Sequence, residues 1–276
     1  MVHAAGAEFL SRHVWASDDP LHGGFSGLEL ADDGLGFTAI SDRGRIATGR
    51  LLRDGAGAIT GVSDLRFERL RDTDGAPMDT KIEDAEGLAV APDGTLFLSF
   101  EGAHRVWRYD SFGAAAVTLP THKDFRSLQL NAGLEALAID GTGALYTLPE
   151  RSGGLSQPFP LYRFDGKAWS VAYTIPRRGD HLPVGADFGP DGKLYLLERN
   201  FSGLLGFSSR VRRFALGADG TLTEKTVLTT PNLRHGNLEG LSVWRDGAGD
   251  IRLTLIADDN FSVFQVSEFV EYRVAE

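Results

Sequence analysis

The sequence predicts an all-β protein, a β-propeller with five blades of four strands each. Three observations lead to this prediction: 34 glycines in 276 residues, a segment of about 50 residues that occurs five times, and short apolar runs separated by Asp-Gly turns. Glycine suits tight turns, and a repeat of this length holds the four short strands of one blade. Because no low-complexity linker divides the repeats, we expect residues 1–276 to form one domain.

Each repeat begins with a short apolar strand. The anchor positions of these first strands lie 60, 49, 49 and 55 residues apart, at Ser26, Glu86, Glu135, Val184 and Glu239. Such regular spacing favours a propeller over a sandwich, which has no fixed repeat of this kind. The longer first interval leaves a six-bladed alternative open, with extra strands inside it.

The other strands of each repeat follow in order. A tight hairpin with a residue at positive φ is expected at Asp33-Gly34, Asp93-Gly94, Asp191-Gly192 and Asp246-Gly247. The second strands then end in an acid, at Asp42, Glu101, Glu150, Glu198 and Asp258. Third strands rich in Arg and aromatic residues come next, and fourth strands are expected at 65–70, 115–119, 171–175 and 225–229.

The fifth repeat ends at Glu276 without a fourth strand, whereas the chain begins with an unassigned strand-like run from Glu8 to Trp15. If this run completes the last blade, it covers an unpaired sheet edge and joins the two ends of the ring. The sequence therefore predicts a propeller that is closed by its N-terminal strand.

The repeated acids are expected to meet at one mouth of the central channel. The first strand of each blade starts at that mouth, and the antiparallel second strand returns to it. One predicted ring holds Glu86, Glu135 and Glu239, and a second ring holds the acids that end the second strands. Carboxylates about 6 Å apart repel each other by roughly 3 kcal/mol per pair at an effective dielectric constant near 20, so a counter-charge is needed.

A divalent cation is one candidate for this counter-charge. The chain has no cysteine, and its seven histidines show no ligand spacing, so an all-oxygen site for Ca²⁺ or Mg²⁺ is more suitable than a zinc site. The predicted metal ligands are Glu86, Glu135, Glu239 and Asp258. The alternative is that these glutamates accept hydrogen bonds from backbone amides at the mouth.

Arginine is the other candidate, because Arg43, Arg105, Arg151 and Arg199 each follow a second-strand acid by one to four residues. These arginines either form salt bridges between blades or point at the mouth, where Arg43, Arg151 and Arg199 would bind an anionic group of a substrate. His181 and His235 precede first strands and could also reach the mouth as proton carriers.

The run Asp258-Asp259-Asn260 differs from the other second-strand ends, since it has two adjacent acids, an amide and no Arg. We predict catalytic roles for Asp258 and Asp259, together with Glu101 and Glu150, and a substrate-binding role for Asn260. The alternative is that Asp259 and Asn260 only cap a turn, which both residue types favour.

Composition excludes several classes of partner. The net charge of −10 argues against binding to nucleic acid or to anionic membranes, which both need an excess of Lys and Arg. No apolar run approaches the roughly 18 residues of a membrane span, and residues 1–7 lack the pattern of a secretory signal. We expect a soluble monomer that binds a small anionic or ester substrate.

Four pairs of motifs resemble the phytase-like family, also described as "esterase-like activity of phytase". The pairs are Gly24–Leu28 with Ser41–Gly44, Asp84–Leu88 with Phe100-Glu101, Gly133–Leu137 with Pro149–Arg151, and Asn237–Leu241 with Asp258–Phe261. The resemblance implies a bacterial, often exported, propeller-like protein with hydrolase activity on esters or phosphate esters. It implies a periplasmic or secreted location. Val184 departs from the pattern, because it interrupts the acidic ring.

Together these inferences predict a metal-dependent hydrolase that acts on ester or phosphate-ester substrates at the acidic mouth. A rival hypothesis is a propeller without catalysis, in which a Ca²⁺ ion is structural and the loops capture a ligand or a protein. A fold of this kind does not decide between the two.

Overall fold

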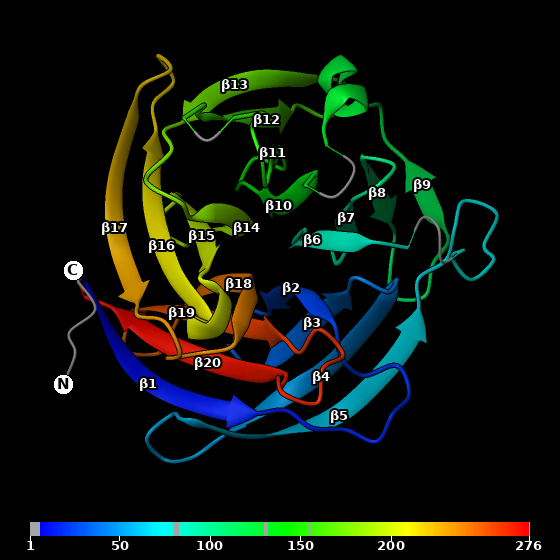
Figure 1. The fold of residues 1–276 in the computed structure, drawn as a ribbon. Coiled ribbons are helices and arrows are strands. Elements are labelled where there is room, and N and C mark those ends of the chain that lie inside the picture. Colours follow the sequence, from blue (N-terminus) through cyan, green and yellow to red (C-terminus); the bar gives the residue numbers. More distant parts are fainter. Residues whose placement is uncertain (1–5, 80–82, 130–131, 155, 276) are drawn as a thin grey trace.

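The computed structural model describes residues 6–79, 83–129, 132–154 and 156–275, and it shows a five-bladed β-propeller (Figure 1). Each blade is an antiparallel sheet of four strands, and the blades surround a central axis. The prediction of five four-stranded blades is therefore confirmed. No helix in the described part of the chain is long and apolar enough to span a bilayer.

Blades one to three follow the chain in simple order. Blade one comprises β2 (Phe25–Leu30), β3 (Gly36–Ser41), β4 (Arg45–Arg53) and β5 (Ile59–Arg69). Blade two comprises β6 (Ala85–Val90), β7 (Leu96–Phe100), β8 (Arg105–Tyr109) and β9 (Ala116–Thr118). A short 3-10 helix, η1 (Lys123–Ser127), leads to blade three, which comprises β10 (Leu134–Ile139), β11 (Leu145–Pro149), β12 (Phe159–Phe164) and β13 (Trp169–Ile175).

Blades four and five complete the ring. Blade four comprises β14 (Leu182–Phe188), β15 (Leu194–Phe201), β16 (Phe207–Leu216) and β17 (Leu222–Thr230), with a 3-10 turn, η2 (Gly203–Leu205), between β15 and β16. Blade five comprises β18 (Asn237–Arg245), β19 (Ile251–Asp258), β20 (Glu268–Val274) and the N-terminal strand β1 (Ala7–Val14). The predicted closure by the N-terminal strand is confirmed.

The long first interval of the repeat has a simple origin. The two outer strands of blade one, β4 and β5, are 9 and 11 residues long, and a loop that holds the isolated bridge between Arg71 and Pro77 follows them. These features account for the extra length without another sheet in the described residues, so the six-bladed alternative is wrong.

Aromatic packing ties the N-terminal segment to the blades on both sides of the closure. Trp15 is buried directly after β1, and its ring stacks on Phe25 of blade one with centroids 4.5 Å apart. On the other side it stacks on Phe269 of blade five, with centroids 5.3 Å apart. Buried aromatic pairs of this kind contribute about 0.5–1.5 kcal/mol each beyond the area that they bury. The closure therefore rests on side-chain packing as well as on the β1–β20 ladder.

Turn glycines between the first and second strands are placed largely as predicted. Gly34, Gly94 and Gly192 have φ values of 66°, 86° and 70°, a region that L side chains rarely adopt. In blade five the positive φ falls on Gly249, not on Gly247, because the turn is closed by a hydrogen bond from the Gly249 amide to Asp246. That part of the turn prediction is wrong by two residues.

The centre of the ring is packed nearly shut. Small residues follow the anchor positions of the first strands, and a Cβ atom on Gly185 would lie 2.3 Å from the carbonyl oxygen of Glu239. A Cβ on Gly87 would lie 2.8 Å from the carbonyl oxygen of Glu135. Glycine is needed there so that neighbouring first strands can approach each other. The cavity between these strands has a volume of only about 10 Å³, so the two mouths are separate surfaces.

Candidate functional site

A β-bulge at the start of each first strand positions the inner ring of side chains. In blades one, three, four and five the register shifts by one residue across Ser26, Glu135, Val184 and Glu239, and in blade two it shifts within the segment that holds Glu86 and Gly87. A bulge leaves its extra residue outside the ladder and re-aims the side chain. The predicted ring positions of Glu86, Glu135 and Glu239 are thus structurally equivalent.

The ends of the second strands form the outer ring, with one correction in blade four. The residue of the second strand that pairs with the start of the first strand, directly before its bulge, is Pro149 in blade three, Ala257 in blade five and Glu198 in blade four. The next residue faces the mouth, which selects Asp42, Glu101, Glu150, Arg199 and Asp258. The prediction that Glu198 belongs to this ring is wrong by one position.

Glu198 instead belongs to a salt-bridge network inside blade four. Its carboxylate has no exposed area and accepts hydrogen bonds from Arg210 at 2.7 Å and from Arg212 at 2.8 and 2.5 Å. Arg212 is 1% exposed and also reaches Glu224 at 3.0 Å. This network lies between strands of one blade and uses Arg210 and Arg212, so it is not the salt bridging between blades that was the alternative for the predicted arginines.

Arg199 supplies positive charge to the acidic ring. Its guanidinium donates to Glu239 at 2.5 Å, to Glu150 at 3.2 Å and to the side-chain oxygen of Asn237 at 2.7 Å. It therefore joins the acids of blades three and five from its own position in blade four. With only 20% of its side chain exposed and its donors engaged by acids, Arg199 has the contacts of a counter-charge rather than those of a substrate ligand.

Eight carboxyl groups from the starts of the first strands and the ends of the second strands interact electrostatically around this mouth in the described residues. They are Asp42, Asp84, Glu86, Glu101, Glu135, Glu150, Glu239 and Asp258. We refer to these eight as the acidic cluster. Arg199 forms salt bridges with Glu150 and Glu239, and Arg151 lies 3.5 Å from Glu150. The charges of Arg43 and Arg45 act on Asp42, and that of Arg105 acts on Asp84. The charged neighbours of Glu86 and Glu101, in contrast, are other carboxyl groups.

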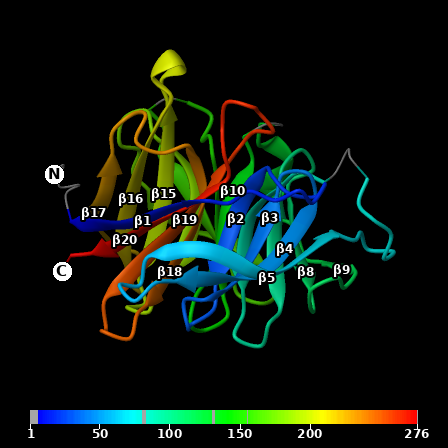
Figure 2. The ribbon, with the colours of Figure 1, turned by 90° about the horizontal axis from the view of Figure 1, so that it is seen from below.

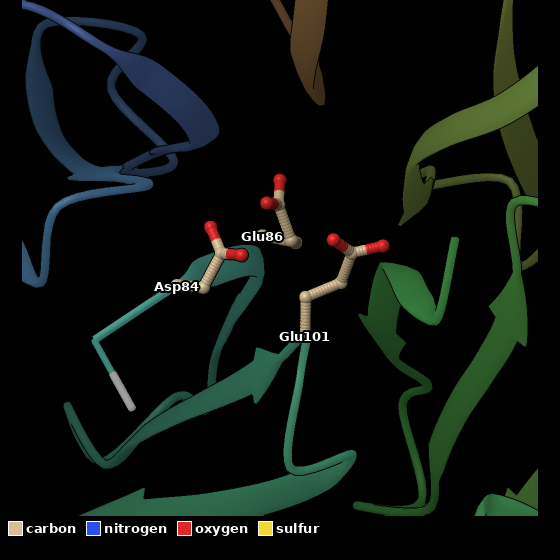
Figure 3. Close-up of side chains that lie close together, drawn as sticks. All are labelled: Asp84, Glu86 and Glu101. Carbon is tan, nitrogen blue, oxygen red and sulfur yellow. The ribbon is translucent and has the colours of Figure 1, made fainter. Parts of the chain in front are cut away.

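The most compact part of the acidic cluster is in blade two. Carboxylate oxygens of Asp84, Glu86 and Glu101 all lie within 4.8 Å of one another, and the three groups point into the same space (Figure 3). Asp84 and Glu86 come from the start of β6, and Glu101 comes from the end of β7. This set shares only Glu86 with the ligands predicted from the sequence, and Asp84 is an addition.

Burial and mutual repulsion change the acidity of this set. The pKa of Glu86 lies well above its usual value because burial disfavours the charged form and because Glu135, Glu239, Asp84 and Glu101 are close. The pKa values of Asp84 and Glu101 are raised too, mainly by burial. Three hard oxygen donors at this spacing fit a divalent cation of the Ca²⁺ or Mg²⁺ type, which would offset the repulsion.

Two of the predicted metal ligands have other surroundings. Glu135 is buried, and its pKa is raised well above the usual value by burial and then by Glu150 and Glu101. Glu239 is bound to Arg199, and its pKa is raised by burial although Arg199 opposes that shift. Both glutamates thus lie next to Asp84, Glu86 and Glu101, but they do not belong to this compact set.

Asp258 lies at the opposite side of the acidic cluster. One carboxylate oxygen accepts from the backbone amide of Asn260 at 2.7 Å, and the other lies 3.4 Å from the side-chain amide of Asn237. Burial, followed by the charge of Glu239, raises the pKa of Asp258 to about 8. At neutral pH this carboxyl group therefore holds a proton that it can donate.

Asp259 and Asn260 shape the loop between β19 and β20. Asp259 accepts hydrogen bonds from the amides of Gly24 and Phe261, both at 3.0 Å, and from the Ser267 hydroxyl at 3.0 Å. Asn260 is exposed with φ at 49°, and its side chain donates to Gln265. These are the contacts of turn capping, and the catalytic role of Asp259 stays a prediction.

Arg43 and Arg151 are the predicted anion ligands that no carboxylate encloses. The Arg43 guanidinium lies 3.6 Å from the ring centroid of Phe261, a cation–π contact across the β19–β20 loop. Arg151 is 56% exposed, and its Nε lies 3.5 Å from Glu150. Arg151 thus combines a contact to the acidic cluster with a largely accessible guanidinium.

The two histidines are engaged elsewhere. His235 is buried against Tyr272, with Nε2 and the phenol oxygen 2.6 Å apart, and burial lowers its pKa to about 4. His181 contacts the Ser208 hydroxyl at 3.4 Å, and burial lowers its pKa as well. The hydrogen bonds of both histidines therefore go to Ser208 and Tyr272 and do not support the expectation that they reach the acidic cluster.

The fold and the site together define a five-bladed propeller with an acid-rich mouth. The family model described as "Phytase-like: Esterase-like activity of phytase" matches residues 20–261, and the chain therefore belongs to this family. The match includes every member of the acidic cluster, and it confirms the resemblance seen in the motifs. The family description indicates a hydrolase-like function.

Two further comparisons concern curated sequences and solved structures. No curated protein sequence matches the chain. Among solved structures, the chain is similar to a virginiamycin B lyase from Staphylococcus aureus at 14% identity, covering 95% of this chain and 74% of that chain with a TM-score of 0.46. It is also similar to an α-L-arabinofuranosidase from Podospora anserina in complex with cellotriose, at 13% identity with 98% and 97% coverage and a TM-score of 0.49.

Proposed function

We propose that the protein is a metal-dependent hydrolase of ester or phosphate-ester substrates, with its active site at the acidic cluster. The observation that carries this proposal is the convergence of Asp84, Glu86 and Glu101 within 4.8 Å, where the charged neighbours of Glu86 and Glu101 are other carboxyl groups. Buried carboxylates without partners are costly, and sites where several pKa values are perturbed together are often functional.

Each group has a proposed task. Asp84, Glu86 and Glu101 would hold a Ca²⁺ or Mg²⁺ ion, which when bound polarises an ester oxygen or a water molecule. Asp258, protonated at neutral pH, would donate a proton to the leaving group. Arg199 stays with Glu150 and Glu239, and it holds these two acids in place.

Substrate contacts would come from the rim of the mouth. Arg151 is accessible and adjoins Glu150, so it can orient an anionic group next to the reacting ester. Arg43, whose guanidinium packs on the Phe261 ring, would bind an anionic group in the same way from the other side of the mouth. We also propose that the protein is exported, because such a location fits a site that uses Ca²⁺.

The test compares metal binding with turnover. Thermal melts of chelated protein with Ca²⁺, Mg²⁺ or Mn²⁺ added back should show an upward shift, and p-nitrophenyl phosphate or acetate should be hydrolysed in the same samples. Glu86→Gln should abolish both the shift and the turnover, because it removes a ligand charge. Asp258→Asn should keep the shift but lower kcat at least a hundredfold, the range expected for a lost general acid.

Asp110→Asn is the matched control, since it removes a carboxylate of the same blade that is 67% exposed and paired with Arg108. It should behave like the wild type in both assays. A metal-dependent shift without turnover of either substrate would favour the propeller with a structural ion. Full activity in folded Asp258→Asn would remove this residue from the mechanism.

A further inference from the structure

A pocket of about 350 Å³ lies beside the acidic cluster, at the rim formed by blades three and four. The loop that follows β11 contributes Arg151, Gly153 and Gly154, and the loop that follows β13 contributes Arg177. Both loops leave their strands on the side of the acidic mouth, because β11 ends there at Pro149 and β12 begins there opposite Ile175. The pocket and the acidic cluster therefore share one face.

Arg177 is held in this pocket by neutral groups. Its Nε donates to the carbonyl oxygen of Gln157 at 3.2 Å, and a terminal nitrogen lies 3.5 Å from the Ser152 hydroxyl. Its guanidinium also lies 4.4 Å from the ring centroid of Phe159. No Asp or Glu among the described residues forms a salt bridge with it, in contrast to Arg199, Arg210 and Arg212. Its orientation is fixed, whereas its charge is not neutralised.

Arg151 links the pocket to the proposed reaction centre. Its side chain lines the pocket, and its Nε lies 3.5 Å from Glu150 of the acidic cluster. Asp180 is the acidic residue of the lining and is exposed to solvent. Because Arg151 is shared with Glu150, the positive charge that is free to meet a ligand in the pocket comes mainly from Arg177, which forms no salt bridge among the described residues. A concave site that holds such a guanidinium is suited to an anionic ligand.

We infer that this pocket binds an anionic oxygen group, a carboxylate or a phosphate, through Arg151 and Arg177. The planar guanidinium presents two parallel donors, which match the geometry of both groups. The further claim, that the group belongs to the substrate, rests on the proposed function. In that case the substrate carries an anionic group next to the ester that is cleaved, and Arg177 determines specificity without touching the reacting atoms.

Anion binding can be measured without any enzymatic assay. Inorganic phosphate and acetate are titrated separately, by calorimetry, into chelated wild type, Arg177→Gln, Arg151→Gln and Arg178→Gln. Arg178 is the matched control, since it is the next residue and its guanidinium is bound to Glu224 at 2.7 Å. The first two variants should bind the preferred anion about tenfold more weakly, about 1.4 kcal/mol, while Arg178→Gln should bind it like the wild type.

The comparison of the two anions identifies the ligand chemistry. Preference for phosphate points to a phosphate group, and preference for acetate points to a carboxylate. The inference is overturned if the wild type binds neither anion, or if Arg178→Gln weakens binding as much as Arg177→Gln does. A thermal melt checks that each variant is folded, and Arg151→Gln provides the same test if Arg177→Gln does not fold.

Turnover separates this inference from the proposed function. With Arg177→Gln, the KM for a p-nitrophenyl ester that carries a free carboxylate should rise about tenfold, and kcat/KM for neutral p-nitrophenyl acetate should not change. Equal effects on both esters would overturn the role in specificity. If the wild type hydrolyses no ester but binds phosphate through Arg177, the proposed function fails and the anion pocket stands.

Discussion

The two mouths of the propeller both contain buried acids, but they stabilise them differently. At the mouth opposite the acidic cluster, Glu29 of β2 and Asp187 of β14 line a cavity of about 650 Å³. The Ser242 hydroxyl lies 3.4 Å from Glu29, and the Val243 amide donates to Asp187 at 2.6 Å. Figure 2 shows the loops that leave the two faces of the ring in opposite directions.

The difference lies in the number of carboxyl groups and in what surrounds them. Two acids next to a hydroxyl and an amide can be accommodated if one of them keeps its proton, and burial raises the pKa of Asp187 to about 7. Eight acids cannot be accommodated in that way without a large electrostatic cost, so the acidic cluster needs cations. Arginines provide part of this positive charge: Arg199 binds Glu150 and Glu239, Arg151 contacts Glu150, and Arg105 lies near Asp84. The proposed metal ion would provide the rest, between Asp84, Glu86 and Glu101.

Substitution of Arg199 should cause the largest change in the free energy of unfolding. Arg199→Met leaves Glu239 without its cationic partner and Glu150 with only the exposed Arg151, and we expect the free energy of unfolding in chelator at pH 8 to fall by about 3 kcal/mol. Urea denaturation provides the measurement. Arg151→Met is the control, because its exposed ion pair should contribute at most about 1 kcal/mol. Similar losses in both variants would mean that Arg199 is not the counter-charge of the cluster.

A smaller change in the free energy of unfolding should have opposite signs for acids with and without a cationic partner. Glu86→Gln removes an acid whose charged form is disfavoured by burial and by the neighbouring carboxyl groups, so it should raise the free energy of unfolding in chelator by about 1 kcal/mol. Glu239→Gln breaks the contact with Arg199 and should lower it by about 1–3 kcal/mol. Urea denaturation at pH 8 compares the two variants. Shifts of the same sign would contradict the division of the cluster into paired and unpaired acids.

Architecture could be predicted from the sequence because its signals are local and repeated. The 49-residue spacing of Glu86, Glu135 and Val184, together with the Asp-Gly turns, indicates one blade after another. The closure could be predicted as well, because one unit lacked a strand and the N-terminal run was left over. Neither inference required knowledge of which side chain faces which way.

The register of blade four could not be fixed by the acids alone. Adjacent residues on a strand point to opposite sides, so an error of one position exchanges Glu198 for Arg199 and reverses the charge at the mouth. The spacing contained the missing signal, since 15 residues separate Glu86 from Glu101, Glu135 from Glu150, and Val184 from Arg199. Asp84 was missed because the other blades have Gly24, Gly133, Leu182 and Asn237 at that position.

The smallest predicted effect concerns the mouth opposite the acidic cluster. Because the folded-state pKa of Asp187 is raised to about 7, the folded protein retains a proton that the unfolded chain releases near pH 4. Stability from this group is therefore present below about pH 4 and decreases as the pH rises toward 7. Asp187→Asn removes the titration and keeps an oxygen that can accept from Val243. Relative to the wild type, its melting temperature should gain about 2–4 °C between pH 5 and pH 8.

Thermal melts at the two pH values test this expectation, with Asp110→Asn as a control whose carboxylate is largely exposed. The control should follow the wild type at both pH values. If Asp187→Asn does so too, the proton is held elsewhere, and Glu29, whose pKa burial and Asp187 raise, becomes the group to change. If Asp187→Asn instead loses stability at pH 8, Asp187 is ionised in the folded protein, and the opposite mouth needs a cation as the acidic cluster does.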